Sequence, residues 1–543
     1  MQTRKRLLDG VARCYGSTFG QATLGAAVFW VALPPLDLWP LAWIAPIWWL
    51  MLIRRRELAG QRPYGSLWLA GFLFWLAAIH WLRLPFWATA FGWVALSAYL
   101  GCYLPLFVGL SRVAVHRCRI PLLAAAPAVY MGLELARGHV LTGFNMAALA
   151  HTQYRWIDLI QVSDLGGEYL VSFVIVFVAA CVAELLPCDD RRWRIWPLGP
   201  LVLMLAGVLG YGRLRVAEDP PEAQLRIALI QGSIDTQINL PPSEQERIFP
   251  QYYRLSEEAV RQHGKLDLVV WPESMFPAVW ITGEDQPAHP WREFQEEFHA
   301  ALVRMGERFG AMVLGVDRRH FTAEGVKHYN TAVHVSSTGA ILGAYDKRHL
   351  VMFGEYVPLT GWFPWLRELK PVNSLNLTLD PGEHPAAFEV GPLRVAPNIC
   401  YESVLPHVIR RQLNVLAQAG QSPHVLLNLT NDGWFWGSSE LDMHLVCGVF
   451  RAVECRKPFL IAANTGISAW IDADGRVRRR GPKRDTAVVL AEPSADRRTS
   501  WYLWSGDWPA GLCLAACAVL AGLGAWERWF KACGTTQCRT RRA

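Results

Sequence analysis

The sequence predicts a polytopic α-helical membrane domain followed by an α/β domain. Hydrophobic residues make up 52% of the 543 residues, and 26 residues are tryptophan. This is more apolar material than one soluble core requires. Apolar stretches long enough, or nearly so, to cross a membrane fill the first 215 residues and recur once near the C-terminus. Between them, from about residue 225, short apolar runs alternate with longer amphipathic stretches, which is typical of an α/β domain.

We expect eight of the apolar stretches to span a membrane. A helix needs about 20 residues to cross the hydrocarbon layer. The second and third stretches are shorter, but neither contains Asp, Glu, Lys or Arg. The eight stretches are residues 17–35, 38–53, 66–82, 88–111, 120–137, 168–187, 196–213 and 508–526.

The distribution of cations predicts the orientation of these spans. Basic clusters occur at every second junction, among them residues 4–6, 54–56 and 191–194, whereas the alternate loops carry almost no charge. Because cytoplasmic loops are the ones enriched in Lys and Arg, both termini are expected in the cytoplasm and the long segment between spans seven and eight outside it. The net charge of +7 is thus explained by topology, and no nucleic-acid partner is expected.

The loop after the fifth stretch has ionisable residues next to an apolar span. Glu134 and Arg137 are one helical turn apart. Such groups inside a membrane suggest a functional site, with a role in binding a lipid head group or in docking. The alternative is an interfacial pair whose charged ends reach the water.

The predicted domain boundaries follow these patterns. Residues 1–215 form the membrane domain, 216–224 a linker, and 225–495 the outer domain; residues 496–530 hold the return segment and the eighth span, and 531–543 a basic cytoplasmic tail. Helices are expected near residues 243–263 and 291–309 of the outer domain. Strands are expected near residues 225–231, 266–271, 311–316, 331–336, 388–390, 393–400, 425–429, 459–463 and 469–472.

Three residues at the ends of strand-like runs are candidates for catalysis. Cys400 follows an apolar run and precedes an aromatic and an acidic residue, and we infer that it is a nucleophile. A thiol attacks a carbonyl only as its thiolate, so it needs a base and a nearby cation. Glu273 and Lys347, each at the end of another apolar run, can supply them. Taken singly, each has a plainer interpretation, a small buried hydrophobe for the cysteine and solvated surface for the other two.

Several motifs together resemble one known family. They are Trp271-Pro-Glu273, Tyr345-Asp-Lys347-Arg-His-Leu, Phe353-Gly-Glu355-Tyr-Val-Pro, Asn398-Ile-Cys400-Tyr-Glu402, Asn428-Leu-Thr-Asn-Asp-Gly-Trp434 and Asn464-Thr-Gly-Ile-Ser468. In this order they resemble the nitrilase superfamily of carbon-nitrogen hydrolases, and within it the apolipoprotein N-acyltransferases. The resemblance implies a nitrilase-like αββα sandwich for the outer domain. At residues 435–444 the chain departs from the family pattern, where the pocket for the acyl acceptor is expected.

The resemblance also implies a mechanism. Glu273 would take the proton of Cys400, Lys347 would stabilise the oxyanion, and a thioester acyl-enzyme would form. Glu355 would orient Lys347 or assist proton transfer, whereas Tyr401 and Glu402 would shape the pocket, the Tyr401 N–H serving as a second oxyanion donor. The implied acyl donor is a membrane phospholipid, and the acceptor is the N-terminal amine of diacylglyceryl-cysteine on an apolipoprotein. The implied location is the bacterial plasma (inner) membrane, with the catalytic domain in the periplasm.

Two aromatic segments could form an apolar path for an acyl chain. One is a lid containing Phe353, Tyr356, Trp362 and Phe363, for which a buried core loop is the alternative. The other, which would form the opposite lip, contains Met275, Phe276 and Trp280.

Other functions and partners are weighed against these. A membrane-tethered amidase or nitrilase would use the same three residues with water as acceptor, and a lipoprotein-binding scaffold would form no acyl adduct. The sequence has neither a His-Glu-x-x-His motif nor a glycine-rich phosphate loop, so no metal or cofactor is expected. We expect a monomer.

Overall fold

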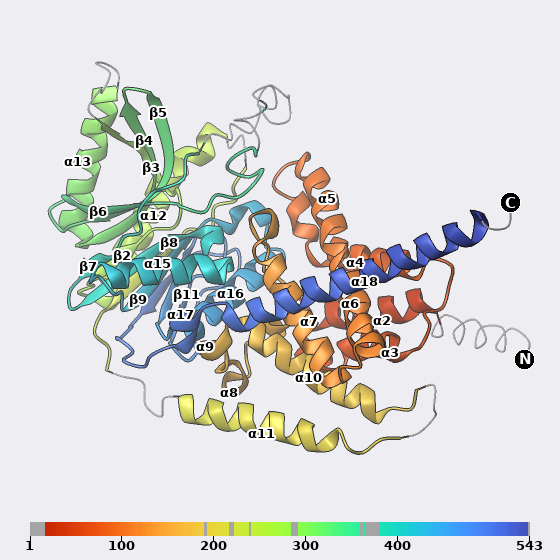
Figure 1. The fold of residues 1–543 in the computed structure, drawn as a ribbon. Coiled ribbons are helices and arrows are strands. Elements are labelled where there is room, and N and C mark those ends of the chain that lie inside the picture. Colours follow the sequence, from red (N-terminus) through yellow and green to blue (C-terminus); the bar gives the residue numbers. More distant parts are fainter. Residues whose placement is uncertain are drawn as a thin grey trace, which may run out of the picture. The chain divides into compact units, whose positions relative to one another are not determined.

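The chain forms two compact units, described here one at a time (Figure 1). The computed structural model describes residues 17–188, 193–216, 222–237, 241–283, 291–358, 363 and 379–540, without the side chains of 242, 291 and 527–540. The first unit takes in Met1–His80, Trp93–Arg215 and Ser505–Ala543, and the second takes in Trp81–Gly92 and Val216–Trp504. Sequence analysis had placed residues 81–92 and 496–504 with the membrane domain and its return segment.

The first unit is helical. Its main helices are α2 (Thr18–Ala32), α3 (Ala45–Arg54), α4 (Pro63–Ala78), α5 (Thr89–Gly101), α6 (Tyr103–Arg112), α7 (Leu122–Arg137), α10 (Glu168–Leu185), α11 (Leu198–Arg215) and α18 (Trp508–Thr540). Each of the eight apolar stretches therefore contains helix. Among the described residues, three segments are long and apolar enough to cross a membrane, namely Thr89–Arg117, Glu168–Leu185 and Trp508–Trp526. Eight spans remain a prediction.

Small residues let these helices approach closely. A Cβ atom on Gly71 of α4 would lie 2.8 Å from the carbonyl oxygen of Gly101 at the end of α5. A Cβ atom on Gly132 of α7 would likewise lie 2.6 Å from the backbone of Cys513 in α18. Close backbone contact at small residues is the usual way in which apolar helices pack where the surroundings are apolar as well.

Glu134 and Arg137 lie inside the helical unit. Arg137 Nη2 donates to Glu134 Oε1 at 3.4 Å, and the guanidinium carbon lies 5.2 Å from the centre of the Trp75 ring. Both residues are buried, with 4% and 6% of their surface exposed. They border a cavity of about 80 Å³ whose other walls include Phe29, Trp49 and Phe74. The interpretation as an interfacial pair with its charges in water is therefore wrong.

The second unit contains two stacked β-sheets. The first sheet has the order β13-β1-β2-β4-β5-β6, with β3 paired to β4, and the second has the order β12-β11-β10-β9-β8-β7. The strands of the first are β1 (Ile227–Gln231), β2 (Leu268–Val270), β3 (Phe276–Gly283), β4 (Met312–Thr322), β5 (Gly325–Val335), β6 (Ile341–Asp346) and β13 (Ala487–Ala491). Those of the second are β7 (Phe388–Val390), β8 (Leu393–Ile399), β9 (Val425–Thr430), β10 (Phe459–Ala463), β11 (Ala469–Ile471) and β12 (Val477–Arg480). In the middle of each sheet the strands are parallel, β1-β2-β4 in one and β8-β9-β10 in the other.

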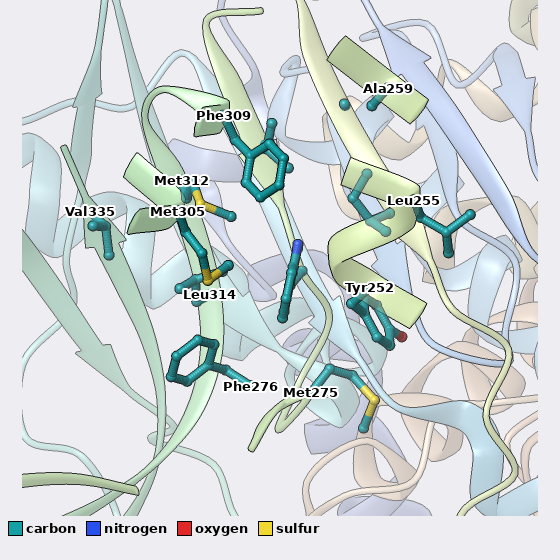
Figure 2. Packing of buried hydrophobic residues seen from close by; sticks show 14 of the residues in the cluster. Tyr252, Leu255, Ala259, Met275, Phe276, Met305, Phe309, Met312, Leu314 and Val335 are labelled. Atoms are coloured by element: carbon teal, nitrogen blue, oxygen red, sulfur yellow. The ribbon is translucent and has the colours of Figure 1, made fainter. Parts of the chain in front are cut away.

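Alternating side chains bury both faces of the first sheet. Leu229 and Val270 point toward the second sheet and pack there against residues such as Val395 and Leu427. Their neighbours Ile230 and Val269 point the other way, into a core formed with helices α12 (Pro242–His263) and α13 (Trp291–Phe309) (Figures 1 and 2). Strands buried on both faces are expected to be continuously apolar, which these are.

Helices also pack against the second sheet, so the layers run helix, sheet, sheet, helix. Helix α16 (Glu440–Cys455) contacts β10, and α15 (Pro406–Gln418) packs on α16. The expected αββα sandwich is therefore confirmed. The expected strands did not include β3, β6, β12 and β13, although Lys347 had been placed at the end of the apolar run that forms β6. Of these, β12 has a Val-Arg-Arg-Arg sequence at the sheet edge that carries almost no apolar pattern.

Candidate active site

Strand ends bring the three predicted catalytic residues together. Glu273 follows β2, Lys347 follows β6, and Cys400 follows β8. In open sheets with parallel strands, sites lie beyond the carboxyl ends of those strands. Because the two sheets stack face to face, the ends of β2 and β8 meet although they are far apart in the sequence.

Lys347 lies at the centre of the site. Its Nζ is 3.2 Å from Glu273 Oε1 and 2.6 Å from Glu355 Oε1, and only 1% of the residue is exposed. Burial by itself would lower the pKa of the ammonium, but the negative charges of Glu273 and Glu355, together with Cys400, outweigh it and raise the pKa well above its ordinary value. Lys347 is therefore a permanent cation at the site.

Glu273 is held in a fixed orientation. Asn330 on β5 donates its amide to Oε1 at 2.7 Å, and the backbone N–H of Asn431 donates to Oε2 at 2.9 Å. The segment that carries Glu273 also lies directly against β4, where a Cβ atom on Gly315 would come within 2.2 Å of Pro272 O. Only glycine leaves room for the Pro272–Glu273 backbone at this place. Sequence analysis had not identified Asn330 or Asn431 as site residues.

Cys400 has a backbone conformation that is unusual for a residue with a side chain. Its φ is +50°, at the point where β8 ends and the short 3₁₀ helix η7 (Cys400–Val404) begins. Such a conformation costs about 1–3 kcal/mol and persists only where the surroundings enforce it. Here the Cys400 carbonyl accepts hydrogen bonds from Asn428 Nδ2 at 3.1 Å and Ser403 Oγ at 3.0 Å. Cys400 therefore turns the chain out of the extended conformation of β8.

The Cys400 thiol is protonated at rest. Burial raises its pKa well above the usual range, and the carboxylate of Glu273 raises it further, whereas Lys347 lowers it. A thiol in this state attacks a carbonyl only if a base removes its proton as the bond forms. Glu273, which interacts electrostatically with the thiol, is the base that the site provides.

Glu355 and Glu402 support this arrangement from two sides. Glu355 Oε2 accepts from the Val351 N–H at 2.8 Å while its other oxygen contacts Lys347. Glu402 is completely buried and accepts from the backbone N–H groups of Arg348, His349 and Ile399 and from the Tyr345 hydroxyl, at 2.7–3.0 Å. It thereby joins the loop that follows Lys347 to the strand end that carries Cys400.

The remaining predicted site residues divide into exposed and buried groups. The Tyr401 ring stacks on His349 with centroids 6.3 Å apart. Phe353 and Phe363 are exposed, by 55% and 49%, so they do not belong to a buried core loop. Tyr356 is partly exposed, and Trp362 lies outside the described residues.

The prediction of a second lip is wrong. Met275 and Phe276 are buried among the apolar side chains beneath α12 and α13, as Figure 2 shows. Trp280 stacks on Phe298, and the guanidinium carbon of Arg318 lies 4.9 Å from its ring centre. These aromatic residues belong to strand β3 and its packing against α13, so they stabilise the sandwich and do not line a path to the site.

A buried Asp-Glu-His group lies next to Cys400. Potential ligand atoms of Asp432, Glu440 and His444 lie within 4.8 Å of one another, close enough to hold a metal ion. Both ring nitrogens of His444 are nevertheless used in hydrogen bonds, Nδ1 with Asp432 at 3.0 Å and Nε2 with Ser403 at 2.8 Å. Asp432 and His444 therefore belong to a hydrogen-bonded network, and Glu440 Oε1 lies 3.9 Å from Nδ1. The sequence signal of this network was the motif at 428–434, whose side chains had been given no individual roles.

Replacing Glu402 with glutamine tests its supporting role. The amide keeps the size of the side chain but turns an NH₂ group toward donors that need an acceptor. Each buried donor left unsatisfied costs about 1–3 kcal/mol. We expect Glu402→Gln to lower the midpoint of thermal inactivation of the purified protein by several degrees. The control is Glu389→Gln, the same change at an exposed position of β7. Equal midpoints for the two variants would contradict the role.

Comparison with known proteins agrees with this geometry. Residues 25–181 match the apolipoprotein N-acyltransferase N-terminal domain, and residues 226–502 match the carbon-nitrogen hydrolase family. A protein of Rhodopirellula baltica named apolipoprotein N-acyltransferase is 32% identical over 562 residues, covering 92% of this chain and 95% of that protein. One of the same name from Geobacter metallireducens is 34% identical over 520 residues, covering 92% and 94%.

Solved structures also resemble part of the chain. Nit3 of Saccharomyces cerevisiae, a member of branch 10 of the nitrilase superfamily, covers 51% of this chain and 93% of its own length, with a TM-score of 0.36 and 15% identity. The sequence matches extend over both the helical and the sandwich unit, and the motifs around Glu273, Lys347 and Cys400 fall within them. The chain belongs to the apolipoprotein N-acyltransferase family.

Proposed function

We propose that this protein transfers a fatty acyl chain from a membrane phospholipid, through a thioester on Cys400, to the N-terminal amine of diacylglyceryl-cysteine on an apolipoprotein. The observation that carries the proposal is the buried Lys347 ammonium between Glu273 and Glu355, next to the Cys400 thiol. The family match over both units supports the choice of substrates.

In the first half-reaction, Glu273 takes the thiol proton while Sγ of Cys400 adds to the ester carbonyl of the phospholipid. The negative charge that develops on the carbonyl oxygen is stabilised by the Lys347 ammonium and the Tyr401 N–H. When this intermediate collapses, the C–O bond of the ester breaks and the lysophospholipid alcohol leaves with the proton from Glu273. The acyl group remains on Cys400 as a thioester.

In the second half-reaction, the neutral amine of the lipopeptide attacks the thioester carbonyl. The oxyanion forms at the same place and is stabilised by the same donors, while Glu273 accepts the proton that the nitrogen loses. Collapse breaks the C–S bond, and the sulfur recovers its proton from Glu273. The product is an amide, and the enzyme returns to its resting state.

Membrane attachment explains why an amine would receive the acyl group in preference to water. Both substrates are lipids, so a site held at the membrane surface encounters them at high local concentration. The exposed Phe353 and Phe363 give the site an apolar border that suits lipid chains, in agreement with the proposed lid. We place the protein in the bacterial inner membrane with eight spans, both termini in the cytoplasm and the sandwich in the periplasm. The alternating basic clusters support this orientation.

The test uses the purified full-length protein, a phospholipid and a diacylated lipopeptide. Intact-mass measurement should first show one fatty acyl chain on Cys400 and then, after addition of lipopeptide, its loss together with an N-acylated peptide. Free fatty acid without acylated peptide would show a hydrolase with water as acceptor. The absence of any adduct on Cys400 would show a non-catalytic binding protein. Either outcome would reject the proposal.

A further inference from the structure

A second buried network contacts the nucleophile through the backbone carbonyl of Cys400. His444 on α16 lies with Nε2 3.3 Å from that carbonyl oxygen and 2.8 Å from Ser403 Oγ. Its Nδ1 is 3.0 Å from Asp432 Oδ1, which also accepts from Thr430 Oγ1 at 2.7 Å. His444, Asp432 and Ser403 are all at least 97% buried. The mechanism described above uses none of them.

The partners of His444 determine its protonation state. The Asp432 carboxylate can only accept, so Nδ1 carries a proton. The Cys400 carbonyl also can only accept, and Ser403 gives it the single proton of its hydroxyl at 3.0 Å, so Nε2 carries a proton as well. All three contacts are hydrogen bonds when His444 is an imidazolium. Burial alone would lower its pKa, but the charge of Asp432 and the hydrogen bonds with Asp432 and Cys400 outweigh it and raise the pKa.

The second carboxyl group near His444 does not change this balance. Glu440 Oε1 lies 3.9 Å from Nδ1. Burial raises the pKa of Glu440 well above its ordinary value, and the neighbouring charges of Asp432 and Asp442 raise it further. The raised pKa favours the neutral form of Glu440, which leaves His444 and Asp432 as the charged pair of the network.

Fixing this carbonyl also fixes the direction of the next N–H group. In a trans peptide the C=O of Cys400 and the N–H of Tyr401 point in opposite directions within one plane. Donors from Asn428, Ser403 and His444 hold the oxygen in place. A cationic donor on a carbonyl also polarises its peptide group, which makes the N–H on the other side a stronger donor.

We propose that His444, paired with Asp432, is a positioning residue that aims and strengthens the Tyr401 N–H as the second oxyanion donor. The inference rests on the proposed function, in which both half-reactions form an oxyanion at that place. It assigns a role to the hydrogen-bonded Asp-His pair and explains why a buried charge pair lies beneath the nucleophile.

Two reagents that react with Cys400 distinguish this positioning role from a purely structural role of His444. Iodoacetamide alkylates the thiolate at a saturated carbon, so no oxyanion forms, whereas p-nitrophenyl butyrate acylates it through an oxyanion. Both reactions on Cys400 of the full-length protein are followed by intact mass. His444→Asn keeps an amide near the Nδ1 position but does not reach the carbonyl. His444→Gln can place a neutral donor near the Nε2 position.

We expect His444→Asn to slow acylation about 10- to 100-fold, because removing an oxyanion donor entirely costs about 10²–10³. Its alkylation rate should stay within about threefold of the wild-type rate, and His444→Gln should recover part of the acylation rate. Equal losses in both reactions, or unchanged acylation in His444→Asn, would overturn the inference. Failure of the wild-type protein to accept acyl chains from phospholipid, with the ester result as expected, would instead reject the proposed acyl donor and leave the role of His444 standing.

Discussion

Cys400→Ala should eliminate acyl transfer completely and leave no acyl adduct on the protein. The Cys400 sulfur is the atom that bonds to the acyl group. No other group in the described site can take its place. The neighbouring carboxylates and the buried Lys347 do not form a stable acyl intermediate with an ester. A loss of at least about 10⁴-fold is expected, as for the removal of other catalytic nucleophiles. The measurement is the rate of N-acylated lipopeptide formation, together with the intact mass after incubation with phospholipid.

Cys455→Ala is the matched control for this variant. Cys455 is another buried cysteine of the same unit, at the end of α16, and the reaction does not involve it. The control should keep both the adduct and the transfer activity. If the acyl adduct persisted in Cys400→Ala and disappeared in Cys455→Ala, the nucleophile would be Cys455, and its assignment to Cys400 would be wrong.

Lys347→Met should lower the rate of acylation about 10²- to 10³-fold, because the variant loses the cationic oxyanion donor. It should also shift the alkylation of Cys400 to higher pH. The charge of Lys347 lowers the pKa of the thiol, so its removal adds to the increase that burial and Glu273 already cause. The pH dependence of the iodoacetamide rate measures this shift. In the wild-type protein, the alkylation rate should begin to rise only at a pH above the range in which an ordinary cysteine ionises.

Stability effects of this variant have to be separated from catalysis. Removing a buried cation from two carboxylates leaves them without a partner, which costs about 3–5 kcal/mol. The double variant Lys347→Met with Glu355→Gln removes one of the stranded charges and should regain thermal stability without regaining activity. Lys265→Met, at an exposed position before β2, is the control and should change neither property. Recovery of activity in the double variant would show that Lys347 acts only through stability.

Residues at strand ends could be predicted from the sequence because their signals are local. Each of Glu273, Lys347 and Cys400 ends a short apolar run, and the sheet order then brings those ends together. Asn330 offered no such signal. It lies within an 11-residue strand, and only the antiparallel pairing of β5 with β4 and β6 places its amide beside Glu273.

The misread second lip shows the limit of composition. A run of aromatic residues interrupted by Pro277 suggests a loop, since proline cannot complete the hydrogen bonds of a central strand. Strand β3 escapes this constraint because it pairs with β4 off the main path of the sheet. Its aromatic residues then fill the space beneath α13. The helical segments, by contrast, are marked by long apolar stretches, and each contains helix in the structure.

The segment Trp81–Gly92 is far from the sandwich in the sequence, yet it belongs to the same compact unit. Trp81 is buried, and its ring meets that of Phe435 edge to face with centroids 4.9 Å apart, three residues beyond Asp432. A soluble fragment cut out at residue 216 would therefore lack part of its own domain. It would expose an aromatic surface next to the loop that carries Asp432, and expression trials of the catalytic half should include residues 81–92 or retain the whole chain.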